Sequence, residues 1–325
     1  VAPAMPTNTL PVAEAKPAPV VVATAAVTRA ASAADTPCTN VLPAAKPALP
    51  VPDFKTTVAV QTLLDRANFS PNCIDGIWGN HTRTALAAWQ KDHNLPASGE
   101  LDDASRAALG GFERAFTVHS VTAEEHAALA PVPETWCGKA EATALGYATI
   151  RETLAERYHA SEAVIEKLNP AAAWPDPPVG AVIAVPAGGG RIVGPVTRLE
   201  VALNARLIRA YAADGRLVAL FPCSIAADAS KRPVGDLAVT RCARDPVFIF
   251  DPAVFVESEE ARTIKSKLIV PPGPNNPVGV AWIGLNLPGY GIHGTPHPED
   301  IAKTESHGCF RLANWNARKL LFSVA

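Results

Sequence analysis

The sequence predicts a multidomain protein in which a small α-helical bundle and a small α+β module precede a C-terminal, mainly-β domain. Its 325 residues exceed the roughly 100–200 residues of one ordinary domain. Apolar residues recur at helical spacing in the first half of the chain, whereas strand-like runs punctuated by Pro and Gly follow residue 197. Three consecutive glycines, Gly188 to Gly190, lie between these regions and predict a hinge.

The charge balance argues against classes of protein that depend on a basic surface. The 29 basic and 31 acidic residues give a formal net charge of −2, whereas binding to nucleic acid or to an anionic membrane surface favours a basic patch. The apolar run from Val20 to Val27 is much shorter than the roughly 20 residues that span a bilayer. We therefore expect no nucleic-acid partner and no membrane span.

Six cysteines are compatible with disulfides in an oxidising compartment, although a cytosolic protein can also carry six thiols. Cys223 and Cys242 flank a turn-like segment between two apolar runs, and they are the first candidates for a bridge. Cys38 with Cys73 is a second candidate pair. If Cys309 is kept for chemistry, at least one other cysteine must be unpaired.

The N-terminal region divides into a tether and a helical module. Residues 1–50 are rich in Ala, Pro, Val and Thr, a composition that predicts an extended tether. Residues 51–111 predict three helices: the second can be capped by Asn80 or Thr82, and the third follows Asp102.

A recognisable set of turn and apolar positions runs through this helical module. They are Gln61, Leu63, Leu64, Asp75, Gly76, Ile77, Gly79, Thr82, Ala85, Leu86, Gln90, Leu95, Gly99 and Leu109. The pattern resembles a peptidoglycan-binding three-helix module, which implies that fold and a peptidoglycan partner. Because most of these positions are hydrophobic or turn residues, a purely structural spacer is the alternative.

Residues 112–187 predict a small α+β module. A first strand is expected over residues 116–120, and two short helices follow, broken at His159 with Ser161 as a cap. Its later part contains Ile150, Leu154, Ala155, Tyr158, Val164, Leu168, Asn169, Pro170, Gly180, Val185 and Pro186. This part resembles a LysM glycan-binding module, although the usual Gly-Asp-Thr turn is absent and a long segment follows the first strand. The resemblance implies the LysM fold more strongly than it implies glycan binding.

After a Gly-rich linker over residues 188–196, residues 197–325 predict a β-rich domain. The expected strand-rich runs are Leu199 to Ala210, Leu217 to Ile225, Leu237 to Thr240, Val247 to Phe250 and Val278 to Leu285.

The reactive residues gather near the end of the chain. Three of the eight histidines, His293, His297 and His307, lie in the segment that ends at Cys309. A cysteine attacks carbonyls as the thiolate, so it needs an imidazole that takes its proton and holds a fixed orientation. Successive N–H groups at His307, Gly308 and Cys309 are expected to form a pocket for a developing oxyanion. The arrangement suits acyl transfer.

Two motifs make this interpretation specific: Tyr290-Gly291-Ile292-His293-Gly294-Thr295 and Ser306-His307-Gly308-Cys309-Phe310-Arg311-Leu312. Together they resemble the signature of the L,D-transpeptidase catalytic domain, and the likeness extends over residues 197–325. One departure is Arg232, which stands at the Thr position of the family's Thr-Pro-x-Gly turn.

The resemblance implies a role for each residue of the two motifs. Cys309 is expected to attack the third, diamino-acid residue of a peptidoglycan stem tetrapeptide and to expel the terminal D-Ala. His293 is the expected base, oriented by the Gly294 carbonyl, and His307 with Gly308 shapes the oxyanion pocket. The expected supporting residues are Tyr290, Ser306 and Arg311, with Arg311 either contacting substrate or bracing the loop.

Two other classes of function compete with this one. His293, His297, His307 and Cys309 are acceptable zinc ligands, so a zinc-dependent wall hydrolase is one alternative. A non-enzymatic wall-anchoring protein, with a decayed third domain, is the other. Acyl transfer explains the Gly and Ser residues that flank the motifs, whereas zinc binding does not use them.

The transpeptidase interpretation carries further expectations. It needs no metal and no organic cofactor, and it implies an exported monomer in the periplasm or cell wall. The acceptor stays open: another stem's side-chain amine, a lipoprotein lysine, a free D-amino acid or water.

Overall fold

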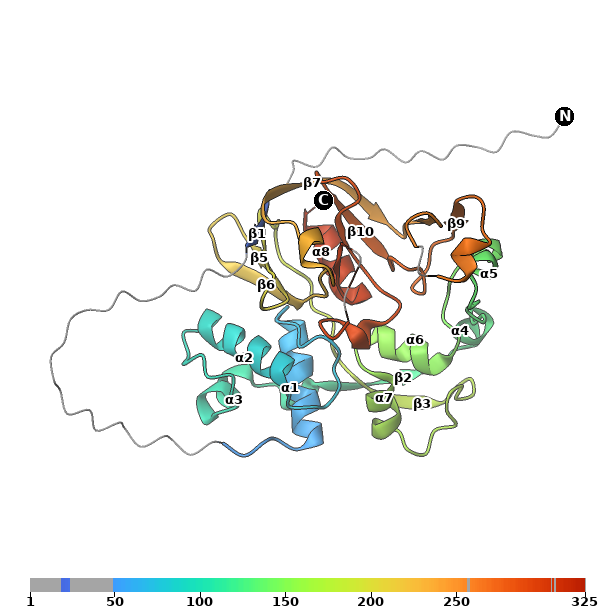
Figure 1. Ribbon diagram of the computed structural model, residues 1–325. Coiled ribbons are helices and arrows are strands. Elements are labelled where there is room, and N and C mark those ends of the chain that lie inside the picture. The colour runs from blue at the N-terminus through green and yellow to red at the C-terminus, as the bar shows by residue number, and fades with distance from the viewer. Residues whose placement is uncertain (1–18, 24–48, 256–257, 305, 307, 325) are drawn as a thin grey trace, which may run out of the picture.

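A computed structural model describes residues 19–23, 49–255, 258–304, 306 and 308–324. The helical module and the central module lie beside each other, and both contact the C-terminal β domain (Figure 1). The Ile74 N–H donates to the carbonyl of His159, and the Ser70 N–H donates to that of Leu220. The modules are therefore packed together within this fold.

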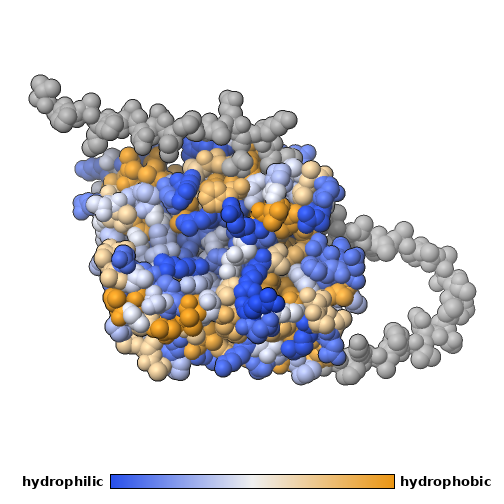
Figure 2. All heavy atoms as spheres, turned by 180° about the vertical axis from the view of Figure 1, so that it is seen from behind, coloured by the Kyte–Doolittle hydropathy of each residue, from blue (hydrophilic) through white to orange (hydrophobic). Residues whose placement is uncertain are grey.

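The surface mixes polar and apolar residues. Seen from behind, hydrophilic residues gather across the middle of the molecule and hydrophobic residues form separate patches around them (Figure 2). None of the helices in the described part of the chain is both long and apolar enough to cross a membrane.

The N-terminal module contains the expected helices, α1 (Phe54–Arg66), α2 (Asn80–Asp92) and α3 (Asp103–Leu109), followed by the 3₁₀ turn η1 (Phe112–Arg114). Asp53 and Asp102 cap α1 and α3 with their side chains. The expected cap of α2 is wrong, because its N-cap is Gly79 and makes no side-chain bond. The Thr82 hydroxyl instead accepts from the buried Gln61 amide at 2.9 Å, which ties α2 to α1.

The central module pairs β2 (Phe116–Ser120) antiparallel with β3 (Val182–Pro186). Between them lie α4 (Ala123–Ala127), α5 (Trp136–Glu141), α6 (Ile150–Arg157) and α7 (Glu162–Leu168). His159 interrupts α6 and α7 with a left-handed φ of 59°, and Ser161 caps α7 as expected. The Asn169 side chain bonds both backbone groups of Ala184 at 2.7 Å, which joins the end of α7 to β3.

The C-terminal domain is a sheet covered by one long helix. Its strands are β4 (Arg198–Ala202), β5 (Leu207–Tyr211), β6 (Leu217–Pro222), β7 (Gly235–Arg244), β10 (Ala281–Leu285), β11 (Gly291–His293) and β12 (Phe310–Arg311). Helix α8 (Asn314–Val324) packs against β7, β10 and β11. The expected run Leu199 to Ala210 is divided into β4 and β5 by a turn in which Arg206 has a φ of 52°. Short 3₁₀ turns are η2 (Ala229–Lys231), η3 (Glu260–Arg262) and η4 (Pro298–Asp300).

Part of the expected tether belongs to this sheet. Pro19–Ala23 forms β1, which pairs parallel with β4 and antiparallel with the first half of β7. Among the described residues the sheet order is β12-β11-β10-β7-β1-β4-β5-β6. Residues 19–23 are thus a sheet strand, which corrects the tether prediction there. The rest of residues 1–48 lies outside the described residues.

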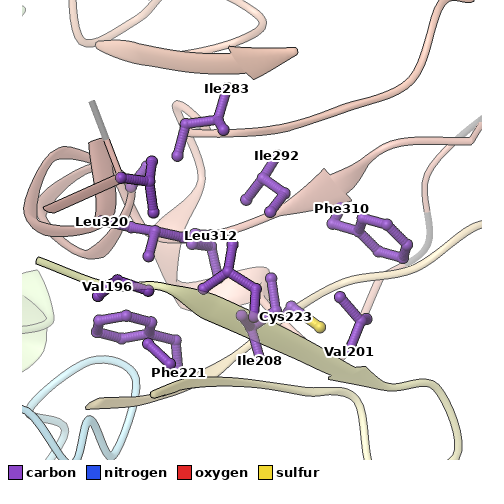
Figure 3. Packing of buried hydrophobic residues seen from close by; sticks show 14 of the residues in the cluster. Val196, Val201, Ile208, Phe221, Cys223, Ile283, Ile292, Phe310, Leu312 and Leu320 are labelled. Atoms are coloured by element: carbon purple, nitrogen blue, oxygen red, sulfur yellow. The ribbon is translucent and has the colours of Figure 1, made fainter. Parts of the chain in front are cut away.

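Buried side chains of the sheet and of α8 form the domain core (Figure 3). Cys223 lies among them, fully buried beside Ile208, and burial raises the pKa of its thiol to about 12. Cys223 and Cys242 are both free thiols, so the expected bridge between them is wrong. Cys242 lies on β7, which β1, β4 and β5 separate from β6 and the adjoining Cys223. Cys73 is also free, and Cys38 lies outside the described residues.

A second hydrophobic cluster joins the central module to the C-terminal domain. The antiparallel strands β8 (Phe248–Phe250) and β9 (Leu268–Val270) form a hairpin-like excursion between β7 and β10. Trp136 of α5 stacks on Phe250 with ring centroids 4.1 Å apart. Glu260 accepts from the N–H groups of Trp136 and Cys137 at the start of α5. The long segment after β2 is therefore anchored on the β8–β9 excursion.

A buried ion network joins all three modules. The fully buried carboxylate of Asp65, on α1, accepts from His159 at 2.8 Å and from the Lys319 ammonium on α8 at 3.1 Å. The Gly189 N–H donates to the same carboxylate at 2.7 Å. Burial opposes ionisation of Asp65, but the charges of His159 and Lys319 outweigh it and hold the carboxyl pKa well below its usual range.

The glycine linker packs closely against α1, so the hinge prediction is wrong. A Cβ at Gly190 would lie 1.9 Å from the Arg66 carbonyl oxygen, and one at Gly188 would lie 3.0 Å from the Asp65 carboxylate. The absence of side chains therefore permits close contact between linker and helix.

Replacing Asp65 with Ala is expected to lower the free energy of unfolding by about 3–5 kcal/mol, because it leaves buried cationic partners without their counter-charge. The measurement is a urea titration followed by tryptophan fluorescence. Glu113→Ala is the matched control, since the Glu113 side chain is 71% exposed and pairs only with its neighbour Arg114. Equal shifts in the two variants would contradict a joining role for Asp65.

Candidate active site

Of the two residues expected to react, His293 ends β11 and Cys309 directly precedes the neighbouring strand β12. β11 and β12 pair in parallel, with His293 opposite Arg311. Side chains alternate between the faces of a strand. His293 and Arg311 therefore share one face with Cys309, which lies two residues before Arg311, whereas Ile292 and Phe310 point into the core.

His293 is held in one orientation and one tautomer. Its side chain is buried, and Nδ1 lies 2.7 Å from the Gly294 carbonyl oxygen. Because a carbonyl oxygen only accepts, Nδ1 carries the proton and Nε2 is left as the acceptor. Burial lowers the pKa of His293 to about 4, with a smaller contribution from the Arg311 charge. The imidazole is therefore neutral at physiological pH.

Cys309 is a neutral thiol in this arrangement. Its Sγ donates to the Gly289 carbonyl oxygen at 3.4 Å. Burial raises the thiol pKa, whereas the Gly291 N–H and the Arg311 guanidinium stabilise the thiolate and lower it. The net shift is upward, so the site rests as a neutral thiol beside a neutral imidazole.

Ser306 organises the loop that carries the nucleophile. Its hydroxyl donates to the Cys309 carbonyl oxygen at 2.6 Å and accepts from the Gly308 N–H at 3.2 Å. The Gly308 N–H, which we expected to face an oxyanion, therefore donates to Ser306 within the loop. A substrate oxygen would have to displace the serine hydroxyl to reach this N–H group. His307 lies outside the described residues.

Tyr290 and Arg232 brace the same loop from outside. The Tyr290 hydroxyl donates to the Lys231 carbonyl at 3.0 Å, and its ring would lie 3.4 Å from a Cβ at Gly308. Arg232 donates to the carbonyls of Ala226 and Ala227. Ala227 in turn donates its N–H to Ser306. Arg232, which stands at the Thr position of the family's Thr-Pro-x-Gly turn, thus supports the loop.

Two parts of the chain match known protein families. Residues 197–324 match the family model "L,D-transpeptidase catalytic domain", and residues 56–109 match the family model "Putative peptidoglycan binding domain". The C-terminal domain is an L,D-transpeptidase catalytic domain. The chain also carries an N-terminal peptidoglycan-binding domain.

Relatives of known name match parts of the chain. It is 28% identical over 123 residues to "Putative L,D-transpeptidase YkuD" of Bacillus licheniformis, covering 38% of this chain and 57% of that protein. It is 33% identical over 87 residues to "Putative L,D-transpeptidase YqjB" of Bacillus subtilis, covering 25% and 40%. The chain thus spans about half the length of the curated relatives it matches. A solved L,D-transpeptidase structure from Xylanimonas cellulosilytica aligns with a TM-score of 0.31 and 16% identity, covering 82% of this chain and 90% of that one.

Trp282 is a residue of the transpeptidase domain that the motifs did not reveal. It pairs with His293 across β10 and β11, and the two rings stack with centroids 5.5 Å apart and planes at 17°. Gly284 and Gly291 leave room for the indole, since a Cβ there would lie 3.1 and 2.7 Å from its atoms. A π face over the imidazole fixes its plane and favours its cationic form. In the sequence, Gly284 follows Trp282 by two residues, and Gly291 precedes His293 by two residues. This spacing was the available signal.

Asn314 is a second such residue, and its side chain contacts the backbone that follows His293. It is the first residue of α8, and its side-chain oxygen accepts from the N–H groups of Val280 at 3.2 Å and Thr295 at 3.0 Å. A Cβ at Gly294 would lie 2.1 Å from this oxygen. Asn314 therefore holds the backbone directly after His293, and the glycine of the His-Gly motif permits this contact.

His297 is not brought to the cysteine. It lies on the loop after His293 and lines a cleft shared with the central module, together with Glu299 and Glu156. Within the described ranges, no group of three or more His, Cys, Asp or Glu side chains is arranged to hold a metal ion.

Alkylation of Cys309 by iodoacetamide is expected to rise steadily from pH 6 to pH 8 without a plateau. Because the thiol pKa is raised, the reactive thiolate is the minor form at neutral pH and grows as the pH rises. Peptide mass mapping is needed, because the exposed Cys137 also reacts. A plateau below pH 7 would reveal a resting thiolate–imidazolium pair and contradict the neutral site.

Trp282→Leu is expected to slow acylation of Cys309 by a carbapenem about tenfold, because it keeps apolar bulk but removes the π face over His293. Trp282→Phe restores an aromatic face and should stay within about threefold of the unsubstituted chain. Single-turnover acylation followed by intact mass measures both rates. Similar rates for the Leu and Phe variants would show that bulk alone is needed.

Proposed function

We propose that the chain is a cysteine-dependent L,D-transpeptidase that acts on peptidoglycan stem tetrapeptides through an acyl-enzyme. The observation that carries the proposal is the place of His293, which ends β11 with the free Nε2 of a fixed tautomer, beside β12, which Cys309 directly precedes. The matching family model supports the reaction class.

The neutral pair defines how the first half-reaction proceeds. As Sγ of Cys309 attacks the carbonyl carbon of the third stem residue, Nε2 of His293 takes the thiol proton. The tetrahedral intermediate then loses the terminal D-Ala, whose nitrogen receives the proton from the imidazolium. Stacking on Trp282 stabilises this transient cation, which the buried site otherwise disfavours. The product is a thioester on Cys309.

An acceptor amine completes the reaction. Neutral His293 takes a proton from the amine as it attacks the thioester carbon, the S–C bond breaks, and the cysteine recovers its proton. Arg311 lies close enough to shift the thiol pKa, so its charge favours negative charge on sulfur during both steps. We assign the oxyanion pocket to the Cys309 N–H together with His307.

The forward modules are proposed to hold the enzyme on the wall. The order β2, α6, α7, β3 with antiparallel outer strands supports a LysM-like module at residues 112–187, in which α4 and α5 replace the usual turn. An enzyme of this class acts outside the cytoplasm, and we propose export to the periplasm or cell wall.

Incubation with a carbapenem is expected to add the mass of one molecule to the chain and none to Cys309→Ala. The β-lactam carbonyl acylates the nucleophile and traps the thioester, so intact-protein mass spectrometry reads the nucleophile directly. With disaccharide-tetrapeptide as substrate, the unsubstituted chain should release free D-Ala.

Cys137→Ala is the matched control, because it removes another thiol outside the site and should leave the adduct and the D-Ala release unchanged. An unmodified chain that remains folded and reduced, with no release of D-Ala, would overturn the proposed function.

A further inference from the structure

A cavity of about 660 Å³ lies where the central module, the linker and α8 meet. It is bounded by α6, by residues 189–192 and by one side of α8. Its volume is in the range of about 300–1,000 Å³ that accommodates small ligands. Neither Cys309 nor His293 lines it, so it is distinct from the active site.

The cavity presents two guanidinium groups that are at most weakly paired among the described residues. Arg318 is 49% exposed, and its nearest carboxylate is that of Asp245 at 4.0 Å. Arg191 is exposed and forms no ion pair with any described residue. By contrast, Lys319 and Arg157 in the same lining are paired with Asp65 and Glu125. Two guanidinium groups are thus available to an anionic ligand.

Glu156, which also lines the cavity, does not cancel this charge at neutral pH. Burial raises the pKa of its carboxyl to about 8, against smaller opposing contributions from the Asn314 amide and Arg318. The protonated carboxyl is a hydrogen-bond donor rather than a negative charge.

The cavity also has aromatic walls and an unpaired donor. Tyr147 and Trp315 line it, and Trp315 stacks on His159 with ring centroids 5.0 Å apart. Trp315 is 6% exposed, yet its Nε1–H has no hydrogen-bond partner in the described part of the chain. A buried donor without an acceptor is costly, so an oxygen-rich ligand would stabilise it. Aromatic faces beside polar groups suit a sugar ring, whose C–H surface packs on them.

We propose that this cavity binds a carboxylate-bearing amino sugar, with the carboxylate between Arg191 and Arg318 and neutral oxygens toward Trp315. The proposal rests on the proposed function for the source of the ligand, since peptidoglycan strands carry such a sugar wherever the stem peptide has been removed from the lactyl carboxylate. The cavity would then be a glycan site built jointly by the central module and the transpeptidase domain.

Isothermal titration of the whole chain tests this proposal with the disaccharide GlcNAc–MurNAc, which carries a free lactyl carboxylate and no stem peptide. N,N′-diacetylchitobiose is the matched ligand without a carboxylate. The acidic disaccharide should bind at least about tenfold more tightly than chitobiose, because a guanidinium–carboxylate bond contributes more than a neutral one.

Arg318→Ala should weaken binding of the acidic disaccharide about tenfold, and adding Arg191→Ala should weaken it further. Arg114→Ala, at a side chain that is 80% exposed and away from the cavity, should leave binding unchanged. Thermal midpoints of the same samples report whether each variant is folded.

Absent binding, equal binding of the two disaccharides, or binding that Arg318→Ala leaves unchanged would each overturn the assignment. The disaccharide has no stem peptide and cannot acylate Cys309, so these results are independent of catalysis. Failure of carbapenem acylation with intact disaccharide binding would instead overturn the proposed function and leave the cavity site standing.

Discussion

The arrangement of the three modules depends on the buried carboxylate of Asp65. An isolated charge at a fully buried position is strongly destabilising, so its partners His159 and Lys319 must come together for the fold to form. These partners belong to the central module and to α8. Helix α8 begins with Asn314, which holds the backbone after His293. Helix α8 therefore carries both Lys319, which belongs to the ion network, and Asn314, which holds the backbone after His293.

Burial also determines the protonation states of His293 and Cys309. Burial disfavours the imidazolium of His293 and also raises the pKa of the Cys309 thiol, so both groups are neutral at physiological pH. In the proposed reaction the cost of separating these charges would fall on the transition state, where the Trp282 ring lies against His293 and the Arg311 charge acts on Cys309.

Local signals in the sequence predicted local structure well. The helical module, the mainly-β domain, the cap at Ser161 and the two catalytic motifs follow from short segments, because turn chemistry and strand alternation act over a few residues. Contacts between distant segments were not predictable in this way. Composition alone did not show that Pro19–Ala23 enters the sheet, nor that Gly188 to Gly190 pack against α1. The roles of Trp282 and Asn314 likewise depend on which strand and loop lie opposite them.

The central module is held to the transpeptidase domain at two separate places, and this limits how the enzyme can use its forward modules. The aromatic cluster of Trp136 and Phe250 anchors one end, and the Asp65 network anchors the other. Two attachments of different chemistry prevent rotation about either one. A glycan bound by the forward modules would therefore lie at a fixed distance and angle from Cys309. In the proposed function, such binding would restrict which stem peptides reach Cys309, and the forward modules would then contribute to substrate selection.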